Sequence, residues 1–119
     1  MKKENIVQQK SYAFALRIIE LNKIVIEDSR EYVLAKQILK SGTSIGANIE
    51  EAIGAQSRRD FRAKLSISYK EARETHYWLR LLRDSQIINS QLSKSLILDC
   101  NELLKIIGSI IKTLKNPNS

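Results

Sequence analysis

The residues of this chain that could carry out catalysis or bind a metal are few. Glu71 and Glu74 stand three residues apart, so on a helix their carboxylates could serve as a general acid and base or hold a metal ion. Such pairs are common on helices, and no Glu-x-x-His repeat of the di-iron bundle type accompanies them. The single histidine, His76, is expected at the edge of the core, and the single cysteine, Cys100, as a buried thiol. We therefore expect no enzyme, no cofactor and no metal site.

Basic side chains are concentrated in one segment. The net charge is +7, and residues 58–83 hold eight basic and three acidic residues. At 100° per residue, five of these basic residues and one tyrosine fall within roughly 80° on a helix. They are Arg59, Arg62, Lys70, Arg73, Tyr77 and Arg80. Because such a stripe can follow a phosphate backbone while the tyrosine stacks on a base, it is our candidate nucleic-acid-binding surface.

A solvated helix face that only keeps the protein soluble would show the same basic pattern. Lys70 and Arg73 can also reach Glu74 and Glu71, and such pairs would weaken the positive field. Oligomerisation argues the other way, because the symmetry copies of a stripe add to a larger field.

Periodic apolar residues predict four helices, which must position this stripe. The chain has only four glycines and one proline, and 43% of its residues are hydrophobic. The predicted helices span residues 5–27, 30–55, 58–84 and 90–114. Asp28 or Ser29 is expected to cap the second helix, Gly54 to end it, and Ser57 with Asp60 to form a capping box for the third. Short connections then favour one domain, residues 1–119, that is all-α: an antiparallel up-down-up-down four-helix bundle.

The stretch SGTSIGANIEEA, residues 41–52, has the composition of a loop. Its apolar residues nevertheless stay in phase with those before it, so we expect the second helix to continue through it. Two glycines inside a helix cost about 1 kcal/mol each against alanine. We expect Gly42 and Gly46 to offset that cost by allowing another backbone to approach closely.

Polar residues beside this apolar line are expected to form a polar seam with the third helix. Hydroxyl and amide groups there can donate hydrogen bonds to carboxylates and fix the register of the two helices. Ser44 and Asn48 are expected to pair with Glu71 or Glu74. The seam comprises Ser41, Ser44, Asn48, Glu51, Glu71 and Glu74.

The third and fourth helices carry more apolar residues than one bundle core requires. On the third helix, Ile67 and Trp78 lie roughly 100° or more from the core stripe. A wide core could cover them, or they could form a subunit interface, where tryptophan is enriched. Because two helices show the excess, we expect a homo-oligomer. The candidate interface residues are Ile67, Trp78, Leu81, Ile97, Leu104 and Ile111.

Charged residues interrupt every hydrophobic run, so no run approaches the roughly 18 apolar residues of a membrane span. The first residues, MKKENIVQQK, lack the apolar core of a signal peptide. One cysteine forms no internal disulfide, which agrees with a reducing compartment. We expect a soluble, cytoplasmic protein without a membrane partner.

Three stretches of the chain resemble the small bacterial four-helix bundle proteins called 23S rRNA-intervening sequence proteins. These stretches are KSYAFALRIIEL, YVLAKQILKSGTSIGANIEEA and DFRAKLSISYKEARETHYWLRLL. The residues that match the second-helix motif are Ser41, Gly42, Ser44, Gly46, Asn48 and Glu51. Those that match the third-helix motif are Lys70, Glu71, Ala72, Glu74, Thr75, Tyr77, Trp78 and Leu79. The fourth helix fits by length and pattern only.

The resemblance implies a bundle that assembles as a cyclic homopentamer with a basic surface suited to nucleic acid. The family is also similar to the accessory variability determinant of diversity-generating retroelements, a basic pentamer that binds a reverse transcriptase and nucleic acid; the shared feature here is YWLRLL. We therefore expect a non-enzymatic, homo-oligomeric protein that binds nucleic acid, with RNA preferred. The alternative is a symmetric scaffold that presents the stripe to an acidic protein such as a reverse transcriptase or another polymerase.

Overall fold

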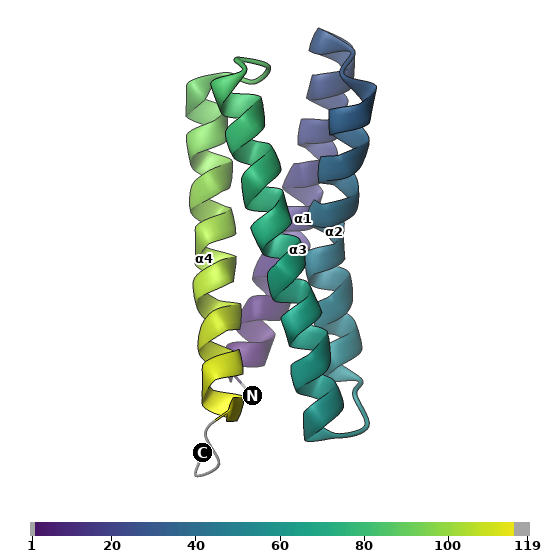
Figure 1. The fold of residues 1–119 in the computed structure, drawn as a ribbon, viewed down its shortest axis with the longest axis vertical. Helices are drawn as coiled ribbons and strands as arrows, with labels where there is room; N and C mark the ends of the chain where they lie inside the picture. Colours follow the sequence, from purple (N-terminus) through teal and green to yellow (C-terminus); the bar gives the residue numbers. More distant parts are fainter. Residues whose placement is uncertain (1, 116–119) are drawn as a thin grey trace.

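The computed structural model describes residues 2–115, with side chains from residue 6 onward. These residues form four helices and no strand: α1 (Lys2–Ser29), α2 (Tyr32–Ile53), α3 (Arg58–Asp84) and α4 (Ser90–Lys115). The helices lie alongside one another in an elongated bundle of 49 × 21 × 19 Å (Figure 1). The prediction of an all-α protein with four helices is confirmed.

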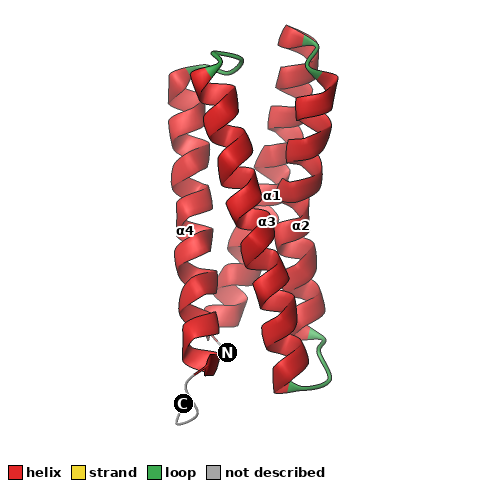
Figure 2. Ribbon diagram, viewed as in Figure 1, coloured by secondary structure: helices red, strands yellow, loops and turns green. Residues whose placement is uncertain are grey.

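Each helix of the bundle packs against two others. α2 contacts α1 and α3, and α4 contacts α3 and α1, so α1 and α3 occupy diagonally opposite corners. The α1–α2 and α3–α4 connections lie at one end of the bundle, and the α2–α3 connection lies at the other (Figure 2). The surface of α3 is therefore bordered by α2 on one side and by α4 on the other.

The core contains the apolar residues whose helical spacing predicted the four elements. Burying each large apolar side chain stabilises the fold by about 1.5–3 kcal/mol relative to exposing it. The largest fully buried side chains are Phe14, Ile18, Leu21, Ile38, Ile45, Ile49, Leu65, Leu79, Leu82, Leu96, Leu103 and Ile107.

α2 continues through the glycine-containing stretch, as predicted. The partner of the two glycines is α1. A Cβ atom at position 42 would lie 2.8 Å from both γ carbons of Ile18, and one at position 46 would lie 3.3 Å from the Ser11 hydroxyl oxygen. Gly42 and Gly46 therefore permit close contact between α1 and α2.

The start of α2 differs from the prediction. α1 continues through Ser29, whose hydroxyl donates to the Val25 carbonyl (2.7 Å), so neither Asp28 nor Ser29 caps α2. Arg30 has a left-handed backbone (φ 57°), and its N–H donates to the carbonyls of Val25 and Ile26. Glu31 is the N-cap residue of α2 and makes no side-chain capping bond. The predicted range of 30–55 is two residues too long at each end.

The other helix ends follow local capping chemistry. α2 ends at Gly54, whose φ of −86° is not the left-handed conformation of a glycine cap. The Ser57 hydroxyl oxygen accepts the Asp60 N–H at 3.0 Å, which confirms the predicted cap of α3. The Asn89 side-chain oxygen accepts the Leu92 N–H at 2.7 Å and caps α4 in the same way.

Within residues 2–115, none of the helices combines the length and the apolar character that a membrane crossing requires.

Candidate nucleic-acid interface

The basic stripe of α3 is exposed along the border with α4. All six predicted residues of the stripe are exposed. Arg59 and Arg62 border a hollow of about 440 Å³ together with Leu114 of α4. Lys70 borders a second hollow of about 400 Å³. Arg73 borders a third of about 640 Å³ and, with Arg80, a fourth of about 250 Å³.

The four hollows follow one another along the line where α3 meets α4, and we call them together the α3–α4 groove. Tyr69 lines both the 400 Å³ and the 640 Å³ hollows. Arg73, Asn101 and Leu104 line both the 640 Å³ and the 250 Å³ hollows. The groove therefore presents the α3 cations beside a concave surface, and an extended ligand could contact several of them at once.

α4 adds three lysines to the groove that the sequence reasoning missed. Lys105 lines the 640 Å³ hollow, and Lys112 and Lys115 line the 400 Å³ hollow. They escaped notice because residues 84–119 hold four basic and three acidic residues, which is nearly balanced. A signal was present in the spacing: Lys105 and Lys112 are seven residues apart and so share one helix face.

Eight of the nine cations that line the groove form no ion pair with a carboxylate among residues 6–115. The ninth, Arg58, lines the 440 Å³ hollow and donates to the Leu114 carbonyl at 3.2 Å. The eight are Arg59, Arg62, Lys70, Arg73 and Arg80 from α3, and Lys105, Lys112 and Lys115 from α4. Glu102 is the one acidic residue among those that line the four hollows, and Lys10 already pairs with it at 3.1 Å.

The glutamates of α3 do not weaken this field in the way that the sequence allowed. Glu74 accepts a hydrogen bond from the Trp78 indole N–H at 3.0 Å. Neither Glu71 nor Glu74 lines any of the four hollows. The pairs of Lys70 with Glu74 and of Arg73 with Glu71 are not formed among residues 6–115.

His76 lies in the groove between two arginines. It is half-buried, and it lines the 250 Å³ hollow with Arg73, Arg80 and Asn101. Burial lowers the pKa of its imidazole, and the charges of Arg80 and Arg73 lower it further, against a hydrogen bond with Asn101 that favours the charged form. His76 is therefore a neutral group at pH 7 in a strongly positive setting, at the edge of the core as predicted.

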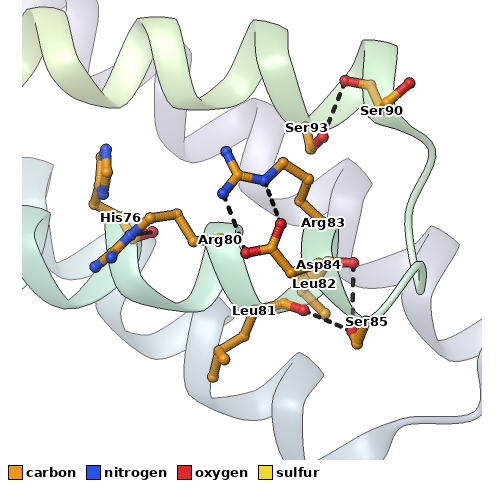
Figure 3. A network of polar contacts seen from close by, with 9 residues as sticks. All are labelled: His76, Arg80, Leu81, Leu82, Arg83, Asp84, Ser85, Ser90 and Ser93. Carbon is orange, nitrogen blue, oxygen red and sulfur yellow. Dashed lines mark hydrogen bonds and ion pairs between the residues drawn. The ribbon is translucent and has the colours of Figure 1, made fainter.

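Arg80 and Arg83 have different surroundings, as Figure 3 shows. Arg80 extends back along α3, where its Nε donates a long bond of 3.4 Å to the His76 carbonyl. The Arg83 guanidinium is held by the neighbouring Asp84 carboxylate at 2.7 and 3.2 Å. The charge of Arg83 is thus satisfied locally, whereas that of Arg80 is available to a ligand.

The two tyrosines of α3 near this surface differ in position. Tyr77, the predicted stacking residue, contacts Trp78 edge-on with ring centroids 5.1 Å apart, and the Arg80 guanidinium lies 5.8 Å from its ring centre. Tyr77 does not line any of the four hollows. Tyr69, which the sequence reasoning did not select, lies in the groove next to Gly108 of α4.

Comparison with known proteins assigns the chain to a family. The model of the 23S rRNA-intervening sequence proteins matches residues 3–109. The chain belongs to this family. It is also similar to a solved protein of unknown function from the S23 ribosomal protein family of Bacteroides thetaiotaomicron VPI-5482, with 51% identity, a TM-score of 0.90, and coverage of 92% of this chain and 98% of that one. No curated protein matches the chain.

The polar contact between α2 and α3 in this intervening-sequence family member differs from the predicted seam. The buried hydroxyls of Ser41 and Thr75 hydrogen-bond to each other at 2.9 Å, and the buried Ser68 hydroxyl donates to the Ile45 carbonyl at 2.8 Å. Glu51 contacts α3 through an ion pair with Lys64 at 3.0 Å.

The expected pairing of Ser44 and Asn48 with carboxylates of α3 was wrong. The Ser44 hydroxyl donates to the Lys40 carbonyl at 2.6 Å, and the Asn48 amide donates to the Ser44 carbonyl at 2.8 Å, both within α2. Short polar side chains inside a helix have a carbonyl of the preceding turn within reach, so these local bonds compete with partners on another helix.

The side chains with possible catalytic or metal-binding chemistry include Glu71 and Cys100. Among residues 6–115, no three His, Cys, Asp or Glu side chains lie close enough together to hold a metal ion. Burial, together with Glu74, raises the pKa of Glu71, and Lys40 opposes the shift. Burial raises the pKa of Cys100 to about 12, and its thiol donates to the Ala72 carbonyl at 3.3 Å. A neutral, enclosed thiol of this kind is a poor nucleophile.

Residues 42–46, GTSIG, match the G-x-S-x-G pattern of hydrolase nucleophiles. That chemistry requires a sharp turn from a strand into a helix, which exposes the serine. Here the pattern lies inside α2, with Ser44 bonded to its own helix. The residues therefore match the pattern in sequence but do not have the backbone geometry that it requires.

The six predicted interface residues fall into two groups. Ile67 and Leu81 are exposed by 43% and 37% on α3. The other four are partly buried against the core of their own chain: Trp78, Ile97, Leu104 and Ile111. Leu104 and Ile111 also line the α3–α4 groove, so they form part of its apolar floor.

Proposed function

We propose that this 23S rRNA-intervening sequence family member is a non-enzymatic protein that binds nucleic acid, with RNA preferred, along the α3–α4 groove. The observation that carries the proposal is the set of eight groove cations that form no ion pair with a carboxylate among residues 6–115. Unpaired cations that line a concave surface keep their charge available for phosphates.

The length of the groove supports a polymeric ligand. From Arg59 to Arg80 the helix rises about 32 Å at about 1.5 Å per residue. Positive side chains occur along this whole length of α3, and three more face them from α4. A small phosphorylated molecule would contact one hollow, whereas a polynucleotide would contact several and would release counterions at each contact.

We also propose that the bundle is antiparallel, in up-down-up-down order, and that it assembles as a cyclic homo-oligomer, a pentamer. Two exposed apolar strips support assembly. One, on α3, comprises Ile67 and Leu81, and the other, on α1, comprises Tyr12, Leu16 and Ile19. Because α1 and α3 are at diagonal corners, the two strips face different directions. Contact between one strip and the other on the next copy is heterologous, the type that forms a ring when the rotation between copies closes.

The test is the salt dependence of RNA binding. Binding of a single-stranded RNA is followed by fluorescence anisotropy over a range of salt concentrations. We expect log K to fall linearly with log salt, and each neutralised phosphate contact to reduce the slope by about 0.7. Arg73 and Lys105 line the 640 Å³ hollow from facing helices. Arg73→Gln and Lys105→Gln should therefore each reduce the slope.

Matched controls come from cations outside the groove. Lys36→Gln on α2 and Lys94→Gln on α4 make the same charge change at exposed positions, so they should leave the slope nearly unchanged. Equal effects of the groove and control variants would show a diffuse attraction and would refute a groove site. An acidic protein could occupy the same positive surface; a protein partner that stays bound after nuclease treatment of the native complex would favour that scaffold role.

A further inference from the structure

We infer that the α3–α4 groove takes single-stranded RNA, with an unpaired base seated against the Tyr69 ring. The inference rests on the proposed function and specifies its ligand. It follows from the position of Tyr69, from the composition of the two hollows on either side of the ring, and from the charges around them.

Tyr69 packs close to α4 because position 108 of that helix is a glycine. A Cβ atom at position 108 would lie 3.3 Å from Cε1 of the tyrosine ring, which is tighter than an ordinary van der Waals contact. Gly108 therefore allows the ring to lie close to the α4 backbone. Glycine is unfavourable in a helix interior relative to alanine, so the close approach of Tyr69 is maintained at some expense in stability.

Tyr69 separates two hollows that have the size of small-ligand sites. The 640 Å³ hollow has Leu98 and Leu104 as its apolar residues, and the 400 Å³ hollow has Ile111. Both volumes fall within the roughly 300–1,000 Å³ of typical ligand pockets. An apolar floor beside an aromatic ring suits the flat face of a nucleobase, whose stacking is tolerant of sequence.

Cations surround both hollows at positions suited to the phosphates on either side of such a base. Arg73 and Lys105 border the larger hollow, and Lys70, Lys112 and Lys115 border the smaller one. The larger hollow also contains the Asn101 amide and the Glu102 carboxylate. Glu102 would repel a phosphate, but its oxygens can accept hydrogen bonds from a base amino group or a ribose hydroxyl.

A duplex does not satisfy this arrangement. Its bases are paired and stacked inside the helix, so they cannot reach an aromatic ring at the floor of a groove, whereas the bases of a single strand are free to turn outward. Duplex RNA would engage only the cations at the rim. The geometry thus predicts a preference for single strands in addition to simple charge attraction.

The first experiment compares a single-stranded RNA, with a site of about twelve nucleotides, and a hairpin RNA of the same composition on the wild-type protein and on Tyr69→Leu. The hairpin is closed by a non-nucleotide linker, so that all of its bases are paired. We expect the single strand to bind more tightly than the hairpin. Tyr69→Leu should weaken single-strand binding about five- to a hundredfold and should leave hairpin binding nearly unchanged. Tyr69→Phe, which keeps the ring, should bind like the wild type. Tyr32→Leu, a change at an exposed tyrosine of α2, is the matched control.

A second variant keeps the inference testable if Tyr69→Leu perturbs folding. Leu98 is 59% exposed and lines the larger hollow, so Leu98→Gln removes apolar surface from the site with little risk to the core. It should weaken single-strand binding severalfold. Val33→Gln, at a position 73% exposed on α2, is its control.

The outcomes separate the base site from the proposed function. If Arg73→Gln and Lys105→Gln weaken binding while Tyr69→Leu and Leu98→Gln do not, the groove binds phosphates only and the base site is overturned. Equal affinity for hairpin and single strand, unchanged in Tyr69→Leu, overturns it as well. If none of the four variants changes binding, both the inference and the groove function fail.

Discussion

At the scale of residues, the aromatic ring of the groove depends on a glycine of another helix. Tyr69 is the aromatic residue that enters the groove, whereas Tyr77, which the helical wheel places with the five α3 cations, lines none of the four hollows. A helical wheel gives the angle of a side chain and not the identity of the helix beside it. The role of Tyr69 depends on Gly108, a residue of another helix, so it became visible only once α3 and α4 were packed together.

His76 provides a direct measure of ligand charge in the groove. In the free protein its pKa lies below the ordinary value, because burial and the Arg80 and Arg73 charges disfavour the imidazolium. A bound phosphate would offset those charges, so we expect the pKa to rise on RNA binding. The affinity should therefore increase as pH falls through the pKa of the complex toward that of the free protein. As the only histidine of the chain, His76 can be titrated by NMR with and without RNA.

Other groups around His76 also influence its pKa. Arg83 also lowers the pKa of His76, whereas Asn101 supplies the opposing hydrogen bond from α4. The neighbouring hollow adds Lys105 and Glu102. In His76→Gln the additional gain in affinity below about pH 6.5 should disappear, while the salt slope at higher pH should persist. An unshifted His76 pKa at saturating RNA would place the phosphates elsewhere.

At the scale of elements, helix existence was predictable and helix ends were less so. Apolar periodicity identified all four helices and carried α2 correctly through its glycines, because the pattern reports the buried face directly. The end of α1 was misjudged because Asp28 and Ser29 have the composition of a cap, whereas the chain reverses at Arg30 in a left-handed conformation that its residue type does not favour. The type of a residue does not reveal to which of two adjoining helices that residue belongs.

The α1–α2 contact predicts different effects on stability for two similar substitutions. Gly42→Ala places a Cβ atom 2.8 Å from two carbons of Ile18, so it should destabilise the fold by about 1–2 kcal/mol even after the gain in helix propensity. Gly46→Ala meets the Ser11 hydroxyl at 3.3 Å and should be nearly neutral. Urea unfolding of both variants measures the difference.

The interpretation of Gly42 depends on its particular partner. Combining Gly42→Ala with Ile18→Ala should cost less than the sum of the two single changes, because the shortened side chain removes the clash. Additive costs would mean that another contact limits the approach of the helices.

At the scale of the whole molecule, the family and the four-helix fold could be predicted from the sequence, but the groove that α3 and α4 form together could not. The stripe on α3 was found because five cations lie on one helix within 26 residues of strongly positive charge. The lysines of α4 lie in a nearly neutral segment, and only the packing of α3 beside α4 brings them together with the stripe. The apolar excess was likewise assigned to an interface, although Leu104 and Ile111 form the floor of the groove.

Assembly is tested at the exposed apolar strip of α3. We expect Ile67→Glu and Leu81→Glu to dissociate the proposed pentamer, because each would bury an unpaired carboxylate in the interface. Both side chains are exposed in the single chain, so the helical content should not change. Light scattering with detection at several angles gives the mass of the assembly.

Val33→Glu is the control for these variants, because Val33 is 73% exposed on α2 and lies outside both strips. It should leave the mass of the assembly unchanged. An intact oligomer in Ile67→Glu and Leu81→Glu would move the interface to another face.

The contact between Trp78 and Glu74 has a practical consequence for following this assembly. The indole N–H is held by the carboxylate at 3.0 Å, the ring is partly buried, and Tyr77 lies against it edge-on. Trp78 is the only tryptophan of the chain, and it lies on the same helix as Ile67 and Leu81. Its emission spectrum reports one defined location, so the arrival of a neighbouring subunit could be timed optically without attaching any label.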